Sequence, residues 1–211
     1  TYSATVTASD GTNSTTQAIT VTIIDVEENI NAPVITSSDT FSANENQTAI
    51  GTVTATDADG DTITYSISGS EITINSSSGV LTFASAPDYE TKSTYSATVT
   101  ASDGTNSTTQ AITVNVTNIN DNNPVITSSS SFTVEENQTS VGSVTANDAD
   151  GDSLTFALSG TDASLLSISS SGVITFNSAP DYETKTSYSI TVSVSDGTNT
   201  TAQSVTVNIT D

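Results

Sequence analysis

Hydrophobic and polar residues alternate along short stretches of this chain, and a period of two is typical of half-buried β-strands. Between these stretches lie turns rich in Gly, Asn and Asp, such as the Asp-Gly-Thr-Asn turn at Asp103. The strands predicted in one such block are 41–45, 50–56, 63–67, 71–74, 80–83, 95–101 and 112–116. Because each strand has one apolar face, we expect two antiparallel sheets packed over a common core in a seven-stranded Greek-key β-sandwich.

The block is repeated along the chain. The string TYSATVTASDGTNSTTQAITV occurs at Thr1–Val21 and again at Thr94–Val114, and a diverged copy runs from Ser187 to Val207. Each full block is close to the roughly 100 residues of a seven-strand sandwich. The predicted domains are a C-terminal remnant of a preceding repeat at 1–31, holding its last two strands and a linker, and full repeats at 32–123 and 124–211, joined head to tail.

The net charge of the chain limits the classes of molecule that it can bind. It has 24 acidic residues against two basic ones, Lys92 and Lys185, and a formal net charge of −22. Phosphate backbones and anionic lipid surfaces repel such a chain, and no apolar run approaches the roughly 20 residues of a membrane span. We therefore expect no nucleic-acid partner and no direct membrane insertion. We interpret both lysines as exposed loop cations, with a salt bridge as the alternative.

The absence of Cys and His excludes thiolate and imidazole metal sites as well as His-based acid–base chemistry. The carboxylates instead gather in recurring motifs: DADGD at Asp57 and Asp148, DYE at Asp88 and Asp181, and Asp-Gly turns. Like charges clustered at fixed places destabilise a fold unless a cation neutralises them, and Ca²⁺ takes six to eight oxygen ligands. A solvated acidic surface is the alternative interpretation. An EF-hand does not fit, because Gly60 is fourth and Ser68 twelfth from Asp57.

Taken in order, the motifs resemble the cadherin repeat over the whole chain. The residues that carry the resemblance in the first full repeat are Glu45, Asp57 with Asp59, Asp88-Tyr89-Glu90, Asp103-Gly104 and the linker Asn118-Ile119-Asn120-Asp121-Asn122 before Pro124. The resemblance implies cadherin- or immunoglobulin-like sandwiches with calcium ions between consecutive repeats.

The resemblance also implies which residues bind calcium. At the linker between the full repeats, the implied ligands are Glu45, Asp88, Glu90, the Ile119 carbonyl, Asn120, Asp121, Asn122, Asp148, Asp150 and Asp196. At the upstream linker, DVEENINAP, they are Glu27, Glu28, Asn29, Asp57, Asp59 and Asp103, with Glu27 and Glu28 in place of Asn and Asp and with two extra residues. Glu136, Asp181 and Glu183 would serve a linker further downstream. Asp61 and Asp152 are ligands or simply shape their turns.

These features predict a calcium-dependent structural and adhesive module of a large bacterial surface or secreted protein, extracellular and not an enzyme. Calcium would stiffen a rod for cell–cell or cell–surface adhesion, as in a biofilm. The alternatives are a calcium-dependent polysaccharide-binding module and a passive spacer in a repeat-built filament. The expected partners are calcium ions and neighbouring repeats, with homophilic or lateral self-association and surface glycans both open. Paired carboxylates can hydrolyse glycosides, but every pair here belongs to a repeating motif.

Overall fold

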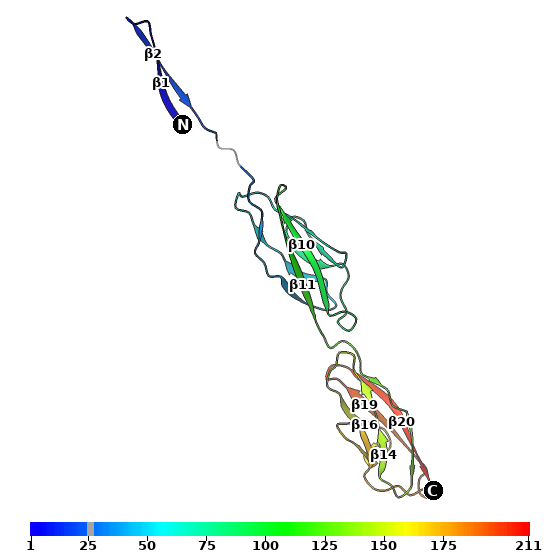
Figure 1. The fold of residues 1–211 in the computed structure, drawn as a ribbon. Coiled ribbons are helices and arrows are strands. Elements are labelled where there is room, and N and C mark those ends of the chain that lie inside the picture. The colour runs from blue at the N-terminus through cyan, green and yellow to red at the C-terminus, as the bar shows by residue number, and fades with distance from the viewer. Residues whose placement is uncertain (25–27) are drawn as a thin grey trace. The chain divides into compact units, whose positions relative to one another are not determined.

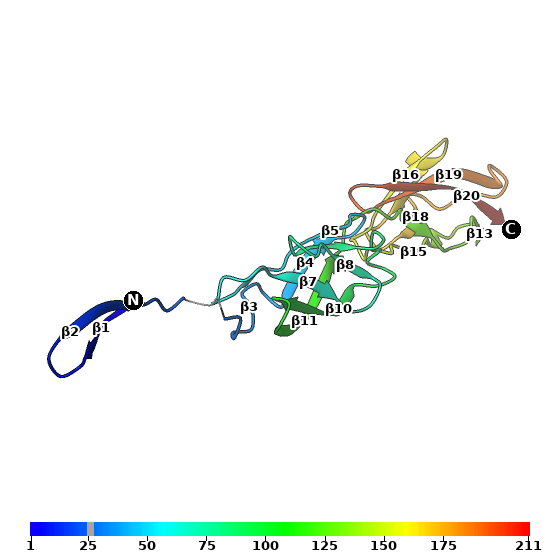
Figure 2. The ribbon, with the colours of Figure 1, turned by 90° about the horizontal axis from the view of Figure 1, so that it is seen from above.

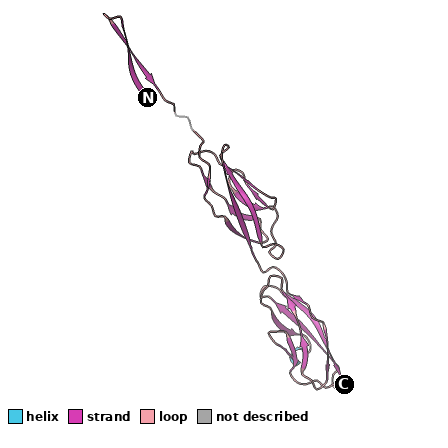
Figure 3. Ribbon diagram, in the orientation of Figure 1, coloured by secondary structure: helices cyan, strands magenta, loops and turns pink. Residues whose placement is uncertain are grey.

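The computed structural model describes residues 1–24 and 28–211. The chain divides into two compact units, one of Thr1–Asp39, Gly51–Thr82 and Ser96–Ile112, the other of Thr40–Ile50, Phe83–Tyr95 and Thr113–Asp211. Strands and loops make up the described residues (Figure 3), with a single 3₁₀ turn, η1 (Ala163–Leu165), as the only helical element among them. No helix in this part of the chain is long and apolar enough to cross a membrane.

The second full repeat lies wholly in the second unit. Its strands are β12 (Val125–Ile126), β13 (Ser131–Glu135), β14 (Ser140–Ser143), β15 (Ala146–Asn147), β16 (Thr155–Ser159), β17 (Leu166–Ile168), β18 (Val173–Phe176), β19 (Ser187–Ser195) and β20 (Thr200–Thr210). One sheet has the order β13-β20-β19-β16 and the other β14-β18-β17, while β12 pairs with β15. Figure 2 shows β16, β19 and β20 together, apart from β18. The predicted two-sheet sandwich is confirmed, but the sheets are not both antiparallel, because β13 pairs with β20 in parallel.

The alternating side chains of β19 and β20 form the core of this repeat. Ile190, Val192 and Val194 alternate with polar residues along β19 and are almost completely buried. On the neighbouring strand Val205, Val207 and Ile209 are buried in the same way. They pack with residues of the opposite sheet, among them Leu166, Ile174 and Phe176. Period-two alternation therefore places one face of each strand in the core, as predicted.

The first full repeat follows the same order. Its strands are β3 (Val34–Ile35), β4 (Thr40–Asn44), β5 (Ala49–Thr52), β6 (Ala55–Thr56), β7 (Thr64–Ile67), β8 (Ile72–Ile74), β9 (Val80–Phe83), β10 (Thr94–Ser102) and β11 (Ser107–Thr117). The sheets are β4-β11-β10-β7, β5-β9-β8 and β3-β6. Figure 1 labels the central pair β10 and β11. The seven predicted strands are present, but the one predicted at 50–56 is interrupted.

The strand predicted at 50–56 is broken because the chain changes hydrogen-bonding partner at Val53 and Thr54. The Val53 N–H donates to the Gly79 carbonyl at 2.9 Å, whereas the Thr54 carbonyl accepts from the Thr36 N–H at 2.8 Å. The residues before the break thus pair as β5 with β9, and the residues after it as β6 with β3. This change of sheet also produces β3, which the sequence did not predict.

The hairpin of β1 (Tyr2–Ser9) and β2 (Ser14–Val21) belongs to the first unit and shows what a repeat needs. Val6 and Val21 are 53% and 56% exposed, although the same string places Val99 and Val114 in β10 and β11 with no exposure. Identical residues are buried only where further strands cover them, because two strands cannot enclose a core. The predicted domain boundaries, 1–31, 32–123 and 124–211, stay predictions.

Candidate metal centre

Four carboxylates from four different segments meet beside the 118–124 linker, all within the second unit. Glu45 follows β4, Glu90 lies in the loop before β10, Asp121 lies after β11, and Asp150 follows β15. Each offers an oxygen within 4.8 Å of the other three. Glu45, Glu90 and Asp121 line a cleft of about 210 Å³ together with Asn46, Asp88, Asn122 and Ala149. Six of the predicted ligands therefore lie at one place.

Glu45 is placed by its strand and held by two backbone donors. The parallel pairing of β4 with β11 brings Asn44 opposite Thr117, so the next residue of each strand lies at the linker. Glu45 is only 2% exposed. Its Oε2 accepts from the Tyr89 N–H at 2.8 Å and its Oε1 from the Ile119 N–H at 2.7 Å. The carboxylate thus joins the DYE loop to the linker through charge-assisted hydrogen bonds.

Asp150 fixes the other side of the linker. Asn122 donates its backbone N–H to Oδ2 and its side-chain amide to Oδ1, both at 2.8 Å, and the Asp121 N–H adds a bond of 3.1 Å. Burial raises the pKa of Asp150, but these hydrogen bonds outweigh it and leave the pKa below the ordinary value. Asp150 is therefore held in its charged form.

The pKa of Glu90 shows that the neighbouring carboxylates repel its negative charge. Desolvation raises its pKa above the ordinary value, and the charges of Glu45, Asp150 and Asp88 add to the rise. Asp88 differs, because hydrogen bonds from the Thr91 hydroxyl and N–H lower its pKa. A cation at this cleft would relieve the repulsion that Glu90 meets.

Three further predicted ligands of this linker are Asp148, Asn120 and Asp196. Asp148 offers an oxygen within 4.8 Å of oxygens of Asp150 and Asp152. The side-chain amide of Asn199 contacts Asn120 Oδ1, the Asn122 carbonyl and Asp196 Oδ2 at 3.1, 3.2 and 3.3 Å. Burial raises the pKa of Asp196, but the N–H groups of Asn199 and Thr198 outweigh it, so the pKa is lowered. The linker and the second repeat thus supply oxygens around a common point.

Three buried side-chain oxygens indicate whether the predicted ligands suit a cation. The Oδ2 atoms of Asp57 and Asp148 and the Oδ1 atom of Asn118 are buried without a hydrogen-bond partner among the described residues. An unpaired buried oxygen is costly, and most native polar groups avoid it. A hard cation would satisfy these atoms, and the donors are all oxygens, as Ca²⁺ prefers. The residues fit calcium. Asn118 was not among the ligands that the resemblance implies.

The upstream linker repeats the arrangement of the 118–124 linker with one change. Asp59 Oδ2 accepts from the Ile30 and Asn31 N–H groups at 2.9 and 2.8 Å, and Oδ1 accepts from the Asn31 amide at 2.7 Å. At the 118–124 linker, Asp150 Oδ2 accepts from the N–H groups of Asp121 and Asn122 in the same way. Ile30 therefore occupies the position that Asp121 has at that linker. The sequence interpretation had put Glu28 there, next to Glu27, because it did not fix the register of the longer linker.

The other predicted ligands upstream and downstream fall into smaller groups. Asp57, Asp59 and Asp61 offer oxygens within 4.8 Å of one another, and so do Glu136, Glu183 and Asp211. Asp181 accepts a hydrogen bond from the Thr184 hydroxyl at 2.9 Å. Asp103 accepts from the Thr105 and Asn106 N–H groups. Glu28 is exposed, and Glu27 lies outside the described residues. All of these remain predicted ligands.

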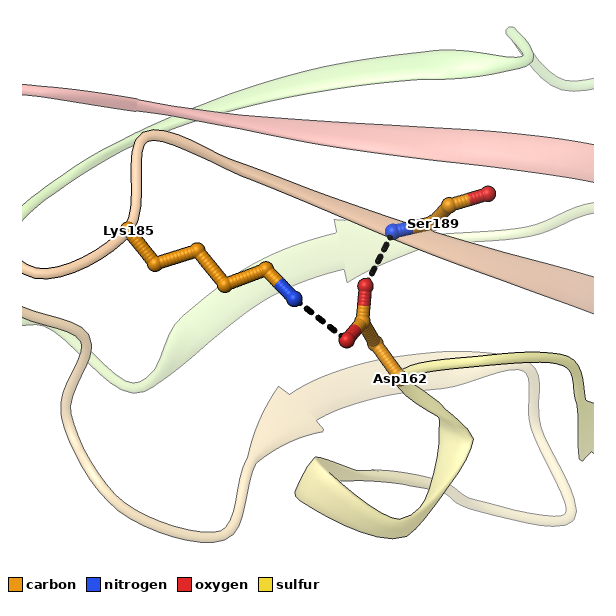
Figure 4. A network of polar contacts seen from close by, with 3 residues as sticks. All are labelled: Asp162, Lys185 and Ser189. Atoms are coloured by element: carbon orange, nitrogen blue, oxygen red, sulfur yellow. Dashed lines mark hydrogen bonds and ion pairs between the residues drawn. The ribbon is translucent and has the colours of Figure 1, made fainter.

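The interpretation of Lys185 as an exposed loop cation is wrong. Its Nζ forms an ion pair with Asp162 Oδ1, and Asp162 Oδ2 accepts from the Ser189 N–H at 2.8 Å (Figure 4). Asp162 is 7% exposed, and Lys185 also lies 4.7 Å from the centre of the Tyr188 ring. These bonds secure the loop around η1, which has no role in the candidate metal centre.

Comparison with known proteins agrees with the geometry. The family model "Cadherin domain" matches residues 39–117, and the model "Bacterial Ig domain" matches residues 120–210. Mouse cadherin-23 EC22–24 superposes with a TM-score of 0.79 at 27% identity, covering 99% of this chain and 74% of that one. Human protocadherin-24 EC1–2 gives 0.73 at 24% identity, covering 87% and 99%. No curated protein matches the chain.

The fold and the acidic linkers define a class of tandem β-sandwich protein. Within that class the chain is cadherin-like and of the adhesion type, and the resemblance inferred from its motifs is confirmed.

Proposed function

We propose that this chain is a calcium-dependent structural and adhesive module in which Ca²⁺ bound at the 118–124 linker fixes one repeat against the next. The observation that carries the proposal is the meeting of Glu45, Glu90, Asp121 and Asp150 within 4.8 Å. Because these residues come from four separate segments, one ion in contact with them restrains all four.

The chemistry of the cleft supports calcium as the ion. Glu45, Glu90, Asp121 and Asp150 could supply four to eight carboxylate oxygens, and Ca²⁺ accepts six to eight in flexible geometry. Without the cation, the four charges repel one another across the linker. Calcium would therefore convert a repelling joint into a cross-linked one, and repeats so joined would form a stiff rod.

The setting that we propose is the surface of a bacterial cell or a secreted protein. The bacterial Ig match at 120–210 and the cadherin match at 39–117 support a bacterial module of the adhesion type. Self-association and surface glycans are the candidate partners. We propose no catalytic role, because each carboxylate group belongs to a repeated joint. A spacer role is the second candidate, favoured by the identical strings at Thr1–Val21 and Thr94–Val114.

Thermal unfolding and small-angle scattering, each in about 1 mM calcium and then in chelator, test the proposal. Calcium should raise the melting temperature, since it binds the folded state, and it should extend the particle. Asp121→Ala and Glu90→Ala should reduce both responses. Asp39→Ala is the control, because Asp39 lies outside the carboxylate groups found among the described residues. If wild-type protein shows no response to calcium, the proposal fails.

A further inference from the structure

Asn106 and Asn199, the last residues of the Asp-Gly-Thr-Asn loops at 103–106 and 196–199, contact side-chain oxygens of residues that we propose as calcium ligands. In the second unit the Asn199 Nδ2 atom lies 3.1 Å from Asn120 Oδ1, 3.2 Å from the Asn122 carbonyl and 3.3 Å from Asp196 Oδ2. These three oxygens come from the linker and from the loop itself. One amide nitrogen thus sits among oxygens that a calcium ion would also need.

The first unit repeats this arrangement at the upstream linker. The Asn106 Nδ2 atom lies 2.8 Å from Asn29 Oδ1, 3.3 Å from the Asn31 carbonyl and 3.4 Å from Asp103 Oδ2. The two linkers differ in sequence and length, and yet the amide makes the same three contacts. Two independent occurrences argue that the contact is a property of the loop.

The loop holds the asparagine in place through its own backbone. Asp196 Oδ1 accepts from the Thr198 and Asn199 N–H groups at 2.7 and 2.6 Å, which leaves Oδ2 for the Asn199 amide. Asp103 accepts from Thr105 and Asn106 in the same way. The amide is therefore presented to the linker by a turn that folds locally.

An amide nitrogen imitates a cation only in part. Its two hydrogens carry partial positive charge and can draw three oxygens together, but the group is neutral and leaves the carboxylate charge uncompensated. Calcium would approach the same oxygens to 2.3–2.6 Å and would use the lone pairs that now accept from the amide. The amide hydrogen bonds and the calcium contacts therefore compete.

We propose that Asn199 and Asn106 are positioning residues that hold the ligand oxygens together in the ion-free protein and give way to the cation. The proposal rests on the calcium binding proposed above. It implies that each asparagine stabilises the ion-free state more than the calcium-bound state. The two residues therefore reduce the stabilisation that calcium adds.

Asn199→Ala tests this with melting temperatures in chelator and in calcium. The melting temperature in chelator should fall by about 2–4 °C, as expected for one lost hydrogen-bonded contact in a chain of this size. The increment on adding calcium should become larger than in wild type, and calorimetric titration should show calcium binding about threefold tighter or more. A purely structural asparagine would lower the melting temperature equally in both conditions. Asn106→Ala should repeat the result at the upstream linker.

Asn177→Ala is the matched control in the same repeat. Asn177 accepts from the Ser167 hydroxyl and donates to the Ser164 carbonyl, and neither partner is a predicted ligand. Its loss should lower both melting temperatures and leave the calcium increment unchanged. If wild type responds to calcium but Asn199→Ala shows an equal or smaller increment, or weaker binding, the positioning role is overturned and the proposed function stands. If wild type does not respond, both are overturned.

Discussion

Glu45 Oε1 lies 2.7 Å from the backbone nitrogen of Ile119, so a side chain at the end of one strand holds the linker that follows another. The Glu45 N–H also donates to the Thr117 carbonyl at 3.2 Å, continuing the pairing of β4 with β11. The linker is therefore attached to the first full repeat by the protein alone. A cation at the cleft would therefore bind to a linker that hydrogen bonds already attach to the first full repeat.

Glu45→Gln should lower stability with and without calcium. The neutral amide keeps the shape of the side chain but offers one acceptor oxygen where the Tyr89 and Ile119 N–H groups now use two. We expect a loss of about 1–3 kcal/mol in chelator, from urea unfolding, together with a smaller calcium increment. Asp39→Asn is the control for the loss of one carboxylate charge, because Asp39 lies outside the carboxylate groups found among the described residues. Equal effects of the two substitutions on the calcium increment would contradict the role of Glu45.

The fold was predictable because its signal is local and repeated. Alternation along residues such as Val99, Ala101, Ile112 and Val114 marks the buried face of a strand wherever the rest of the repeat is present. The interrupted strand at Val53 was not predictable in this way, since a change of hydrogen-bonding partner leaves the alternation intact.

The carboxylates of the site were predictable and their amide partners were not. Asp and Glu are sparse enough for their clustering to stand out, whereas Asn residues such as Asn199 and Asn106 are lost among many others. The place of Ile30 could not be read from the sequence either, because the register of the longer linker is set by hydrogen bonds to Asp59.

The two linkers should bind calcium with different affinities. Asp121 adds a carboxylate to the group of Glu45, Glu90 and Asp150, whereas Ile30 adds none beside Asp59. Fewer charged ligands weaken a calcium site, so calorimetry should resolve a tight class and a class that is weaker by roughly tenfold or more. Asp150→Asn should remove the tight class, and Asp59→Asn, which changes the matching residue upstream, should remove only the weak one. A single class that both substitutions weaken equally would rule this out.

The Asp162–Lys185 pair should make the free energy of unfolding depend on pH. The contribution of this pair can be measured separately from that of the other carboxylates. The Lys185 ammonium, followed by the Ser189 N–H, lowers the pKa of Asp162 below its ordinary value of 3.8. A lowered pKa stabilises the fold above the ordinary pKa, and that contribution is lost as pH falls through the folded value. Asp162→Asn should therefore cost about 1 kcal/mol at pH 7, a low figure because the lysine is partly exposed.

The measurement is the free energy of unfolding of wild type and Asp162→Asn in chelator from pH 7 to pH 3. All other carboxylates titrate in both proteins, so the difference between the two curves isolates Asp162. The difference should shrink below about pH 4. A difference that stays constant over this range would mean that Asp162 acts through its shape and not through its charge.

Gly172→Ala should destabilise the second repeat far more than a typical substitution at a glycine. The residue has a φ of +80°, and a Cβ atom there would lie 2.2 Å from the Val144 carbonyl oxygen. The Gly172 carbonyl accepts from the Val144 N–H at 2.9 Å, so the turn cannot move away without losing the bond between the two segments. Gly197→Ala is the control, because Gly197 has a φ of +98° but nothing within 4 Å of the added Cβ. Urea unfolding in chelator should show a loss of about 1 kcal/mol for the control, from backbone strain alone, and of about 3 kcal/mol or more for Gly172→Ala. Similar losses in the two variants would show that the close approach to Val144 relaxes easily and that strain at positive φ accounts for both.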